Sequence, residues 1–150
     1  MAVCTFSGRL AGSLSLLHLD TGLRIAGEVR GLVDGAGQLS SGRHGFHIHQ
    51  EGALGNGCKD AGGHFNPGSN NHGDPSDTVR HVGDLGNIEA VEGVARVEVL
   101  DGLAQLGGPD SVLGRAIVIH AGEDDLGLGG DQGSLRTGNA GPRIGCCVIT

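Results

Sequence analysis

Tryptophan and tyrosine are absent from the 150-residue sequence, and the only phenylalanines are Phe6, Phe46 and Phe65. A hydrophobic interior must therefore consist mainly of Val, Ile, Leu and Ala. No apolar stretch approaches the roughly 20 residues that a membrane-spanning helix needs, so no membrane partner is expected. No secretory signal precedes the apolar segment at the start of the sequence, which makes the cytoplasm the expected location.

Positive charge is also scarce. Lys and Arg number 10 against 17 Asp and Glu, which gives a formal net charge of −7. Nucleic-acid-binding proteins usually present a basic surface, so a nucleic-acid partner is not expected. Eight histidines are unusual in so acidic a chain and need an explanation.

Glycine is abundant, with 31 residues, well above the usual share of about 7%. The glycines separate short segments that alternate or are apolar throughout, as expected of β-strands joined by tight turns. No segment shows the periodicity of an amphipathic helix of ordinary length. The expected strands are residues 3–7, 13–19, 23–30, 43–49, 84–89, 94–100, 115–120 and 144–149. About eight short strands predict an all-β sandwich or barrel, and the length fits a single domain over residues 1–150.

Residues 50–83 and 121–143 break this pattern, because neither stretch shows a sustained period. Loops longer than about 12–15 residues are uncommon in compact domains and are usually functional or disordered. Both stretches are rich in Gly, Asp and Asn, and both adjoin strands that carry histidines. We therefore expect two long functional loops, held in place by a metal, a disulfide or both.

The segment His44-Gly45-Phe46-His47-Ile48-His49 is the most informative in the chain. In a strand, His47 and His49 project from one face, while Phe46 and Ile48 project from the other. Two imidazoles side by side can bind Zn, Cu, Fe or Ni, and the Phe and Ile can anchor in a core. The pair alone is equally compatible with a polar strand face.

Further histidines favour metal binding. His64, His72, His81 and Asp84 follow with the spacing H-x7-H-x8-H-x2-D, and three histidines with one carboxylate are a plausible tetrahedral zinc site. His120 ends another expected strand and forms a second group with His47 and His49. A lone histidine is more often a surface or hydrogen-bonded residue than a ligand, but a cluster of six with an aspartate reverses that preference.

The four cysteines allow several interpretations. A Cys58–Cys146 bond would close a loop of roughly ninety residues and, in the chain-entropy model, stabilise the fold by about 4–5 kcal/mol. Disulfides are exceptional in the cytosol, so the spacing alone favours four thiols. Cys4 has the character of a buried strand residue, and alternation points Cys147 to the face opposite Cys146.

The sequence closely resembles the copper,zinc superoxide dismutases. The resemblance runs from about residue 2 to the end and is carried by long, ordered motifs. These are residues 45–49 (GFHIH), 63–67 (GHFNP), 80–87 (RHVGDLGN), 120–127 (HAGEDDLG) and 137–143 (TGNAGPR).

The resemblance implies an eight-stranded Greek-key β-barrel whose long loops hold copper and zinc as cofactors. The two implied ligand sets share one histidine, His64, which would bridge both metals as a deprotonated imidazolate. The copper ligands would be His47, His49, His64 and His120, and the zinc ligands would be His64, His72, His81 and Asp84.

Roles for other residues follow from the same resemblance. Asp124 would accept N–H bonds from His47 and His72, and His44 would bond to backbone rather than to metal. Arg143 would be a catalytic residue that attracts the anionic substrate near copper, since guanidinium is always charged. Cys58 and Cys146 match the family's intrasubunit disulfide.

The implied reaction is the disproportionation of superoxide to O2 and hydrogen peroxide, a form of antioxidant defence. Copper would be reduced and reoxidised in turn, while zinc would be structural because it has no redox chemistry of its own. On reduction His64 would leave copper and take up a proton, which makes it a second catalytic residue. Expected partners are the superoxide substrate, a second copy of the chain in a homodimer, and a copper chaperone.

The sequence departs from the family pattern at several places. Residues 32–43 read as a surface insertion, and Cys147 replaces a small residue, offering Cys58 a second partner or a site for oxidation. Gly122 stands where many members carry lysine, Gln132 and Gly133 stand where a Glu pair is usual, and Arg136 replaces a lysine. Long-range attraction of an anion is therefore expected to be weaker.

Two other functions compete with the enzyme. The chain could resemble the dismutase-like domain of a copper chaperone, or a zinc-stabilised module without redox activity. The first predicts a lost copper ligand and an additional CxxC delivery segment, but His120 is present and no such segment is seen. The complete copper set and Arg143 argue against the second.

Overall fold

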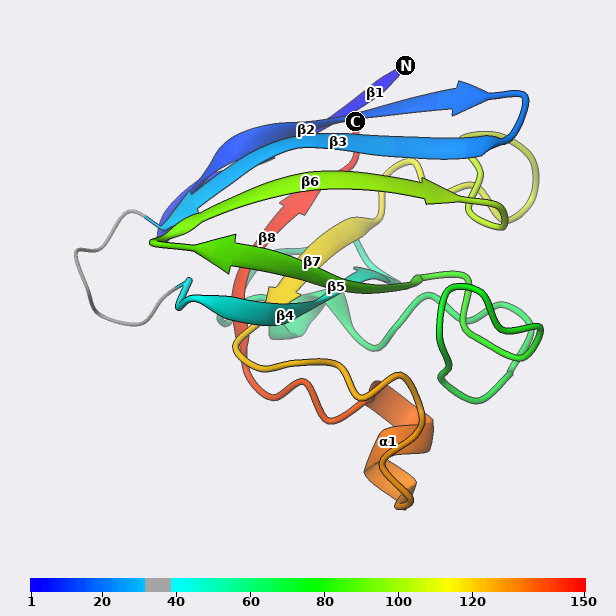
Figure 1. The fold of residues 1–150 in the computed structure, drawn as a ribbon. Helices are drawn as coiled ribbons and strands as arrows, with labels where there is room; N and C mark the ends of the chain where they lie inside the picture. Colours follow the sequence, from blue (N-terminus) through cyan, green and yellow to red (C-terminus); the bar gives the residue numbers. More distant parts are fainter. Residues whose placement is uncertain (32–38) are drawn as a thin grey trace.

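The computed structural model describes residues 1–31 and 39–150, whose strands form one eight-stranded sheet (Figure 1). The strands are β1 (Ala2–Phe6), β2 (Leu10–Leu19), β3 (Gly22–Gly31), β4 (Gly42–His49), β5 (Asp84–Val91), β6 (Val94–Asp101), β7 (Ala116–His120) and β8 (Arg143–Val148). Within the described ranges, helical structure is limited to a 3-10 turn at Lys59–Ala61 and the six-residue helix α1 at Gln132–Thr137.

The order of strands in the sheet is β1-β2-β3-β6-β5-β4-β7-β8, and all neighbours are antiparallel. The non-sequential neighbours β3–β6 and β4–β7 create the two crossovers of a Greek key. The end strands β1 and β8 meet, because Val3 and Thr150 exchange two backbone hydrogen bonds of 2.9 Å. The sheet is thus an almost closed barrel, and the predicted fold class is confirmed.

Each expected strand is present, with shifts of a few residues at its ends. The β2 strand begins at Leu10 rather than residue 13, and the strand expected at 84–89 is β5, which extends to Val91. The helix α1 lies in the second long loop (orange in Figure 1), where Asp131 accepts a hydrogen bond from Ser134 N at 2.8 Å and so caps it. Six residues are too few for a hydrophobic period to reveal a helix in the sequence.

Strand β4 is buried on both faces. Phe46 and Ile48 are fully buried in the barrel core, which consists chiefly of Leu, Ile, Val and Ala as expected. His47 and His49 point the other way and are nevertheless 0% and 1% exposed, because residues 50–83 and 121–143 cover this side. The long loops therefore enclose a polar compartment against the outer face of the barrel.

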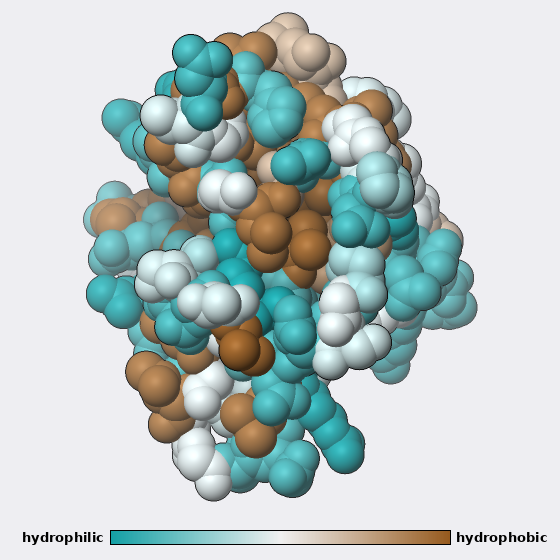
Figure 2. Space-filling model, turned by 90° about the vertical axis from the view of Figure 1, so that its right-hand side faces the viewer, coloured by the Kyte–Doolittle hydropathy of each residue, from teal (hydrophilic) through white to brown (hydrophobic). Residues whose placement is uncertain are grey.

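The surface is mixed. On the face shown in Figure 2, hydrophobic side chains form separate groups among hydrophilic ones. In the part of the chain that the structure describes, no helix is long and apolar enough to cross a membrane. Of the expected insertion, residues 32–38 lie outside the described residues, while Ser40, Ser41 and Gly42 are exposed as expected.

Candidate metal centre

The strands and the first long loop bring the histidines together. His47 and His49 project from β4, and His120 ends the neighbouring strand β7. The loop is attached beside β4, since Ile48 N donates to Gly83 O at 2.9 Å and Phe65 N donates to Ile48 O at 2.8 Å. This attachment places His64 directly opposite His49.

Four histidines converge in the set expected for copper: His47, His49, His64 and His120. Their ligand atoms lie within 4.8 Å of one another. His49 donates from Nδ1 to Gly62 O at 2.8 Å, and His120 donates from Nδ1 to Gly141 O at 3.0 Å. Because Nδ1 carries the proton in both rings, each Nε2 is unprotonated and its lone pair can bind a metal. The two Nε2 atoms are 3.3 Å apart.

The second set, His64, His72, His81 and Asp84, converges in the same way. Oδ1 of Asp84 lies 3.0 Å from His64 Nδ1, 2.8 Å from His72 Nδ1 and 3.2 Å from His81 Nδ1. Its other oxygen, Oδ2, accepts hydrogen bonds from His81 N at 2.8 Å and Gly73 N at 3.1 Å. Backbone donors thus hold the carboxylate with one oxygen turned toward the three imidazoles.

Asp124 joins the two sets. Its carboxylate accepts a hydrogen bond from His47 Nε2 at 2.6 Å and another from His72 Nε2 at 2.7 Å. Asn87 in β5 holds the backbone of Asp124, with Asp124 N donating to Asn87 Oδ1 at 2.7 Å and Asn87 Nδ2 donating to Asp124 O at 3.0 Å. Such contacts fix the tautomer and orientation of a metal-binding imidazole.

Two residues that the sequence reasoning did not single out make this arrangement possible. Asn87 lies in a motif that carried the resemblance, but without an assigned role. Gly138 ends α1 with φ 78°, and a Cβ there would stand 2.0 Å from Asp124 Oδ1 and 2.5 Å from His72 Nε2. Glycine is therefore required for the second loop to pass over the carboxylate. A lone glycine among many gives no signal of this in a single sequence.

Burial controls the protonation of the imidazoles. It lowers the pKa of His47 to about 3 and that of His120 to about 4, with the nearby His64 contributing to both shifts. It also lowers the pKa of His49 and of His64. At neutral pH these four rings are therefore uncharged, which is the form that binds metal.

The zinc-side set is balanced differently. Burial by itself would lower the pKa of His72, but hydrogen bonds to Asp124 and Asp84 raise it to about 9. Against the opposing effect of burial, hydrogen bonds from His64, His72 and His81 hold the pKa of Asp84 far below its usual range. The carboxylates are thus anionic and attract positive charge, which a zinc ion supplies when bound.

An independent observation also indicates that these residues fit two metals. His47 Nδ1 is buried and has no hydrogen-bond partner among the described residues. An orphaned buried nitrogen is costly unless something binds it. In tetrahedral zinc sites with Zn–N distances of about 2.0–2.1 Å, ligand atoms are about 3.3 Å apart, close to the spacings found here. The structure thus supports the predicted cofactors, copper and zinc.

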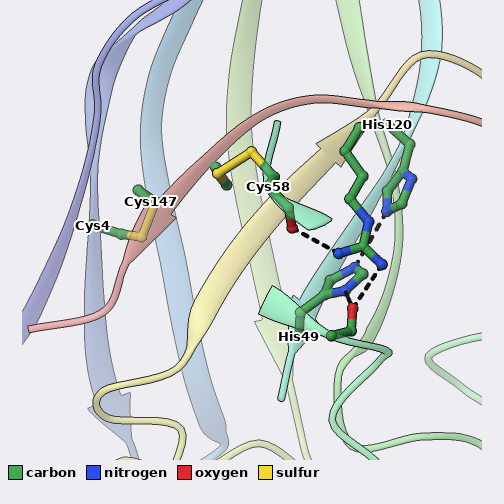
Figure 3. Close-up of a disulfide and its surroundings, with 8 residues drawn as sticks. Cys4, His49, Cys58, His120 and Cys147 are labelled. Atoms are coloured by element: carbon green, nitrogen blue, oxygen red, sulfur yellow. Dashed lines mark hydrogen bonds between the residues drawn. A yellow bond between two sulfur atoms is a disulfide. The ribbon is translucent and has the colours of Figure 1, made fainter. Parts of the chain in front are cut away.

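Arg143 lies beside the copper-side histidines. Its Nη1 donates to Cys58 O at 2.7 Å and its Nη2 donates to Gly62 O at 2.6 Å (Figure 3). A pocket of about 380 Å³ is lined by Arg143, His49, His64, His120 and residues of the 137–141 segment. Three N–H groups of the guanidinium remain for an anion in this pocket. No carboxylate of the described residues pairs with Arg143.

His44 stands apart from both ligand sets. Its Nδ1 lies 2.8 Å from His120 O and its Nε2 lies 2.6 Å from Ser40 O. Both ring nitrogens therefore face backbone carbonyls, in keeping with the role that the resemblance implies.

The cysteines form two disulfides, Cys58–Cys146 and Cys4–Cys147. The first is the bond implied by the resemblance, and the expectation of four thiols from spacing alone is wrong. Cys147, which was expected to offer Cys58 a second partner or a site for oxidation, is oxidised in a disulfide with Cys4, while Cys58 pairs with Cys146. Neighbouring residues of β8 face opposite sides, which directs Cys146 to the loop and Cys147 to Cys4 in the barrel core.

Comparisons with known proteins agree with this geometry. The family model described as copper/zinc superoxide dismutase (SODC) matches residues 11–149. Superoxide dismutase [Cu-Zn] A of Xenopus laevis is 48% identical over 151 residues, covering 99% of this chain and 95% of that protein. Superoxide dismutase [Cu-Zn] of Saccharomyces cerevisiae is 56% identical over 115 residues, covering 76% and 75%.

Two further relatives extend the comparison. The extracellular superoxide dismutase [Cu-Zn] of Brugia pahangi is 46% identical over 147 residues, covering 95% of this chain and 70% of that protein. A crystal structure described as that of the clock protein EA4 superposes with a TM-score of 0.89 at 38% identity, covering 99% of this chain and 92% of the other. With both ligand sets complete, the chain belongs to the copper/zinc superoxide dismutase family and is an oxidoreductase.

Proposed function

We propose that superoxide reacts in the pocket beside His120, with Arg143 attracting and orienting the anion and His64 carrying a proton. Copper, when bound, supplies the redox chemistry by accepting an electron from one superoxide and returning it to a second. The observation that carries the proposal is that Arg143 lines one pocket together with three of the four copper-side histidines, His49, His64 and His120.

The role proposed for Arg143 follows from its fixed position. Carbonyls of Cys58 and Gly62 hold two of its nitrogens, so the guanidinium is fixed at the pocket wall before an anion binds. Burial lowers the pKa of Arg143, but a guanidinium stays charged at any working pH. An anion that enters the pocket therefore meets a preformed site of positive charge.

The role proposed for His64 follows from its place in both ligand sets. Its Nδ1 faces Asp84 and His81 on the zinc side, at 3.0 and 3.1 Å. Its other nitrogen, Nε2, is left for the copper side, where the ring lies 4.1 Å from that of His47 between centroids. A proton held at Nε2 would be available to a peroxide product in the pocket.

The test is to load the protein with copper and zinc, count both metals per chain and measure superoxide disproportionation in the same sample. We expect one copper and one zinc per chain with fast turnover. Arg143→Ala should lower the rate by roughly tenfold or more, because removing one preorganised donor to a reacting anion typically costs about 10²–10³-fold in rate. The matched control is Arg136→Ala, which removes an exposed arginine of α1 outside the pocket lining. Stoichiometric zinc with inactive copper, or equal losses in the two variants, would contradict the proposal.

We also expect the protein to attract the superoxide anion only weakly over long distances. Gly122 N donates to Ala140 O at 2.8 Å, and a Cβ at Gly122 would lie 3.1 Å from that oxygen, so a side chain fits after a small shift. Gly122→Lys should raise the rate at low ionic strength and make it fall more steeply toward 0.1 M, where the Debye length is about 10 Å. Gly122→Gln controls for side-chain size. If the unmodified protein lost rate with salt as steeply as the lysine variant, the prediction would be wrong.

We also propose a homodimer. Gly52 packs against Gly114 and Val148, since a Cβ at Gly52 would stand 2.1 Å from Gly114 O and 3.4 Å from Val148 Cγ1. The adjacent Leu113 is 48% exposed, an apolar residue of the kind that a partner copy would cover. Light scattering should give twice the chain mass of 15.1 kDa.

Copper delivery by a chaperone protein and a cytoplasmic location remain predictions. The near-complete burial of His47 and His49 supports assisted delivery, because a copper ion must reach side chains that are almost closed to solvent. One relative is named extracellular and the others are named without a compartment, so cell fractionation is the appropriate test of location.

A further inference from the structure

Cys4–Cys147 is the disulfide that the metal centre does not use. Cys4 lies in β1 and Cys147 in β8, both are 0% exposed, and their Cα atoms are 5.4 Å apart. The bond joins residues 143 positions apart in the sequence. It therefore ties together the two ends of the chain.

The bond crosses the weakest line of pairing in the barrel. β1 and β8 are the two ends of the strand order, and they meet through the Val3–Thr150 hydrogen bonds and a single bridge between Cys4 and Ile149. By comparison, the ladder between β2 and β3 pairs ten residues of each strand. A covalent link at this seam therefore joins two strands, β1 and β8, that few backbone hydrogen bonds connect.

The two disulfides occupy separate packing environments. Cys4 and Cys147 lie in the main barrel core, whereas Cys58 and Cys146 pack in a small cluster with Ala61, Ala116 and Val118. In Figure 3 the two bonds lie on opposite sides of β8. Although Cys146 and Cys147 are adjacent in sequence, strand alternation keeps their sulfur atoms apart and so separates the two bonds chemically.

The two bonds also differ in what must move before a reductant can reach them. Cys58 and Cys146 are 7% and 8% exposed, and Cys58 lies in a loop where Asn56 and Cys58 both have positive φ, 54° and 70°. Local opening of such a loop leaves the strands in place. Reaching Cys4 or Cys147 requires β1 to separate from β8.

We propose that Cys4–Cys147 is a covalent lock on the barrel seam, which keeps the barrel folded when the Cys58–Cys146 bond is reduced. Cys58 O holds Arg143, and Gly62 O holds both Arg143 and His49, so opening that loop changes the pocket. The lock confines this change to the loop. The inference does not depend on the reaction proposed above.

The first test follows the reduction of the metal-free protein by dithiothreitol, with thiols trapped by iodoacetamide and counted by mass spectrometry. Each step transfers two electrons and two protons from dithiothreitol, which closes to its cyclic disulfide, to one cystine, which becomes two thiols. We expect no thiols at the start, then two adducts on Cys58 and Cys146, and the second pair at least tenfold more slowly. Thiols at Cys4 and Cys147 from the start, or all four appearing together, would overturn the proposal.

The second test measures thermal unfolding by circular dichroism, with metal removed and Cys58–Cys146 reduced. Cys4→Ala/Cys147→Ala should unfold roughly 5–15 °C below the unmodified protein treated in the same way. Unmodified protein that is fully reduced and refolded is the matched control, since it lacks the bond but keeps both side chains. Equal unfolding midpoints for this control and the protein that retains Cys4–Cys147 would overturn the proposal, even if the double variant failed to fold.

Discussion

Asp124→Asn is expected to weaken the binding of both copper and zinc by about 10–100-fold each. The carboxylate accepts one N–H from His47 and one from His72, whereas an amide offers one oxygen and turns an NH2 group toward the other ring. One imidazole therefore loses its partner and its fixed tautomer. Copper and zinc retained after dialysis against graded chelator concentrations give the two affinities.

Glu123→Gln is the matched control, because it removes the same charge from the preceding residue. The Glu123 side chain is 57% exposed, and its nearest cation is the exposed Arg43 at 3.6 Å. Such a pair contributes little, so both affinities should stay unchanged. Equal losses in the two variants would mean that net charge, not the shared carboxylate, determines metal binding.

The fold was largely predictable because the strands alternate clearly and glycine separates them. What the sequence obscured was the covering of β4 by two loops, which buries His47 and His49 as deeply as Phe46 and Ile48. Alternation identifies the two faces of a strand but cannot say that both are buried.

The metal ligands were predictable because histidine is rare outside such roles in this chain and its spacing matched long motifs. The Cys4–Cys147 disulfide was not predictable from the sequence. β1 and β8 are the first and last strands in the sheet order, and the two cysteines come together only when the barrel closes and these strands meet. Strand alternation indicated that Cys147 and Cys146 face opposite sides, but not what lay on the far side. The requirement for glycine at position 138 was also not predictable, because it depends on where Asp124 lies after folding.

Arg80→Gln is expected to destabilise the fold by about 3–5 kcal/mol, the usual effect of removing one partner from a buried ion pair. Arg80 is 3% exposed and pairs with Asp101 at 2.7 Å. Its remaining N–H groups donate to the carbonyls of Pro75, His81 and Val82, so all five donors are used. Glutamine can satisfy few of these acceptors and leaves Asp101 as a buried charge.

The loss should appear as a drop of roughly 6–20 °C in the midpoint of thermal unfolding, followed by circular dichroism. Arg24→Gln is the control, because Arg24 also pairs with a carboxylate on β6, Glu98 at 2.7 Å, but both side chains are exposed. That variant should change the midpoint little. Because Arg80 holds the carbonyl of His81, zinc affinity should fall together with stability in the first variant only. Similar midpoints for the two variants would mean that the zinc loop is held to the barrel by its metal and not by this ion pair.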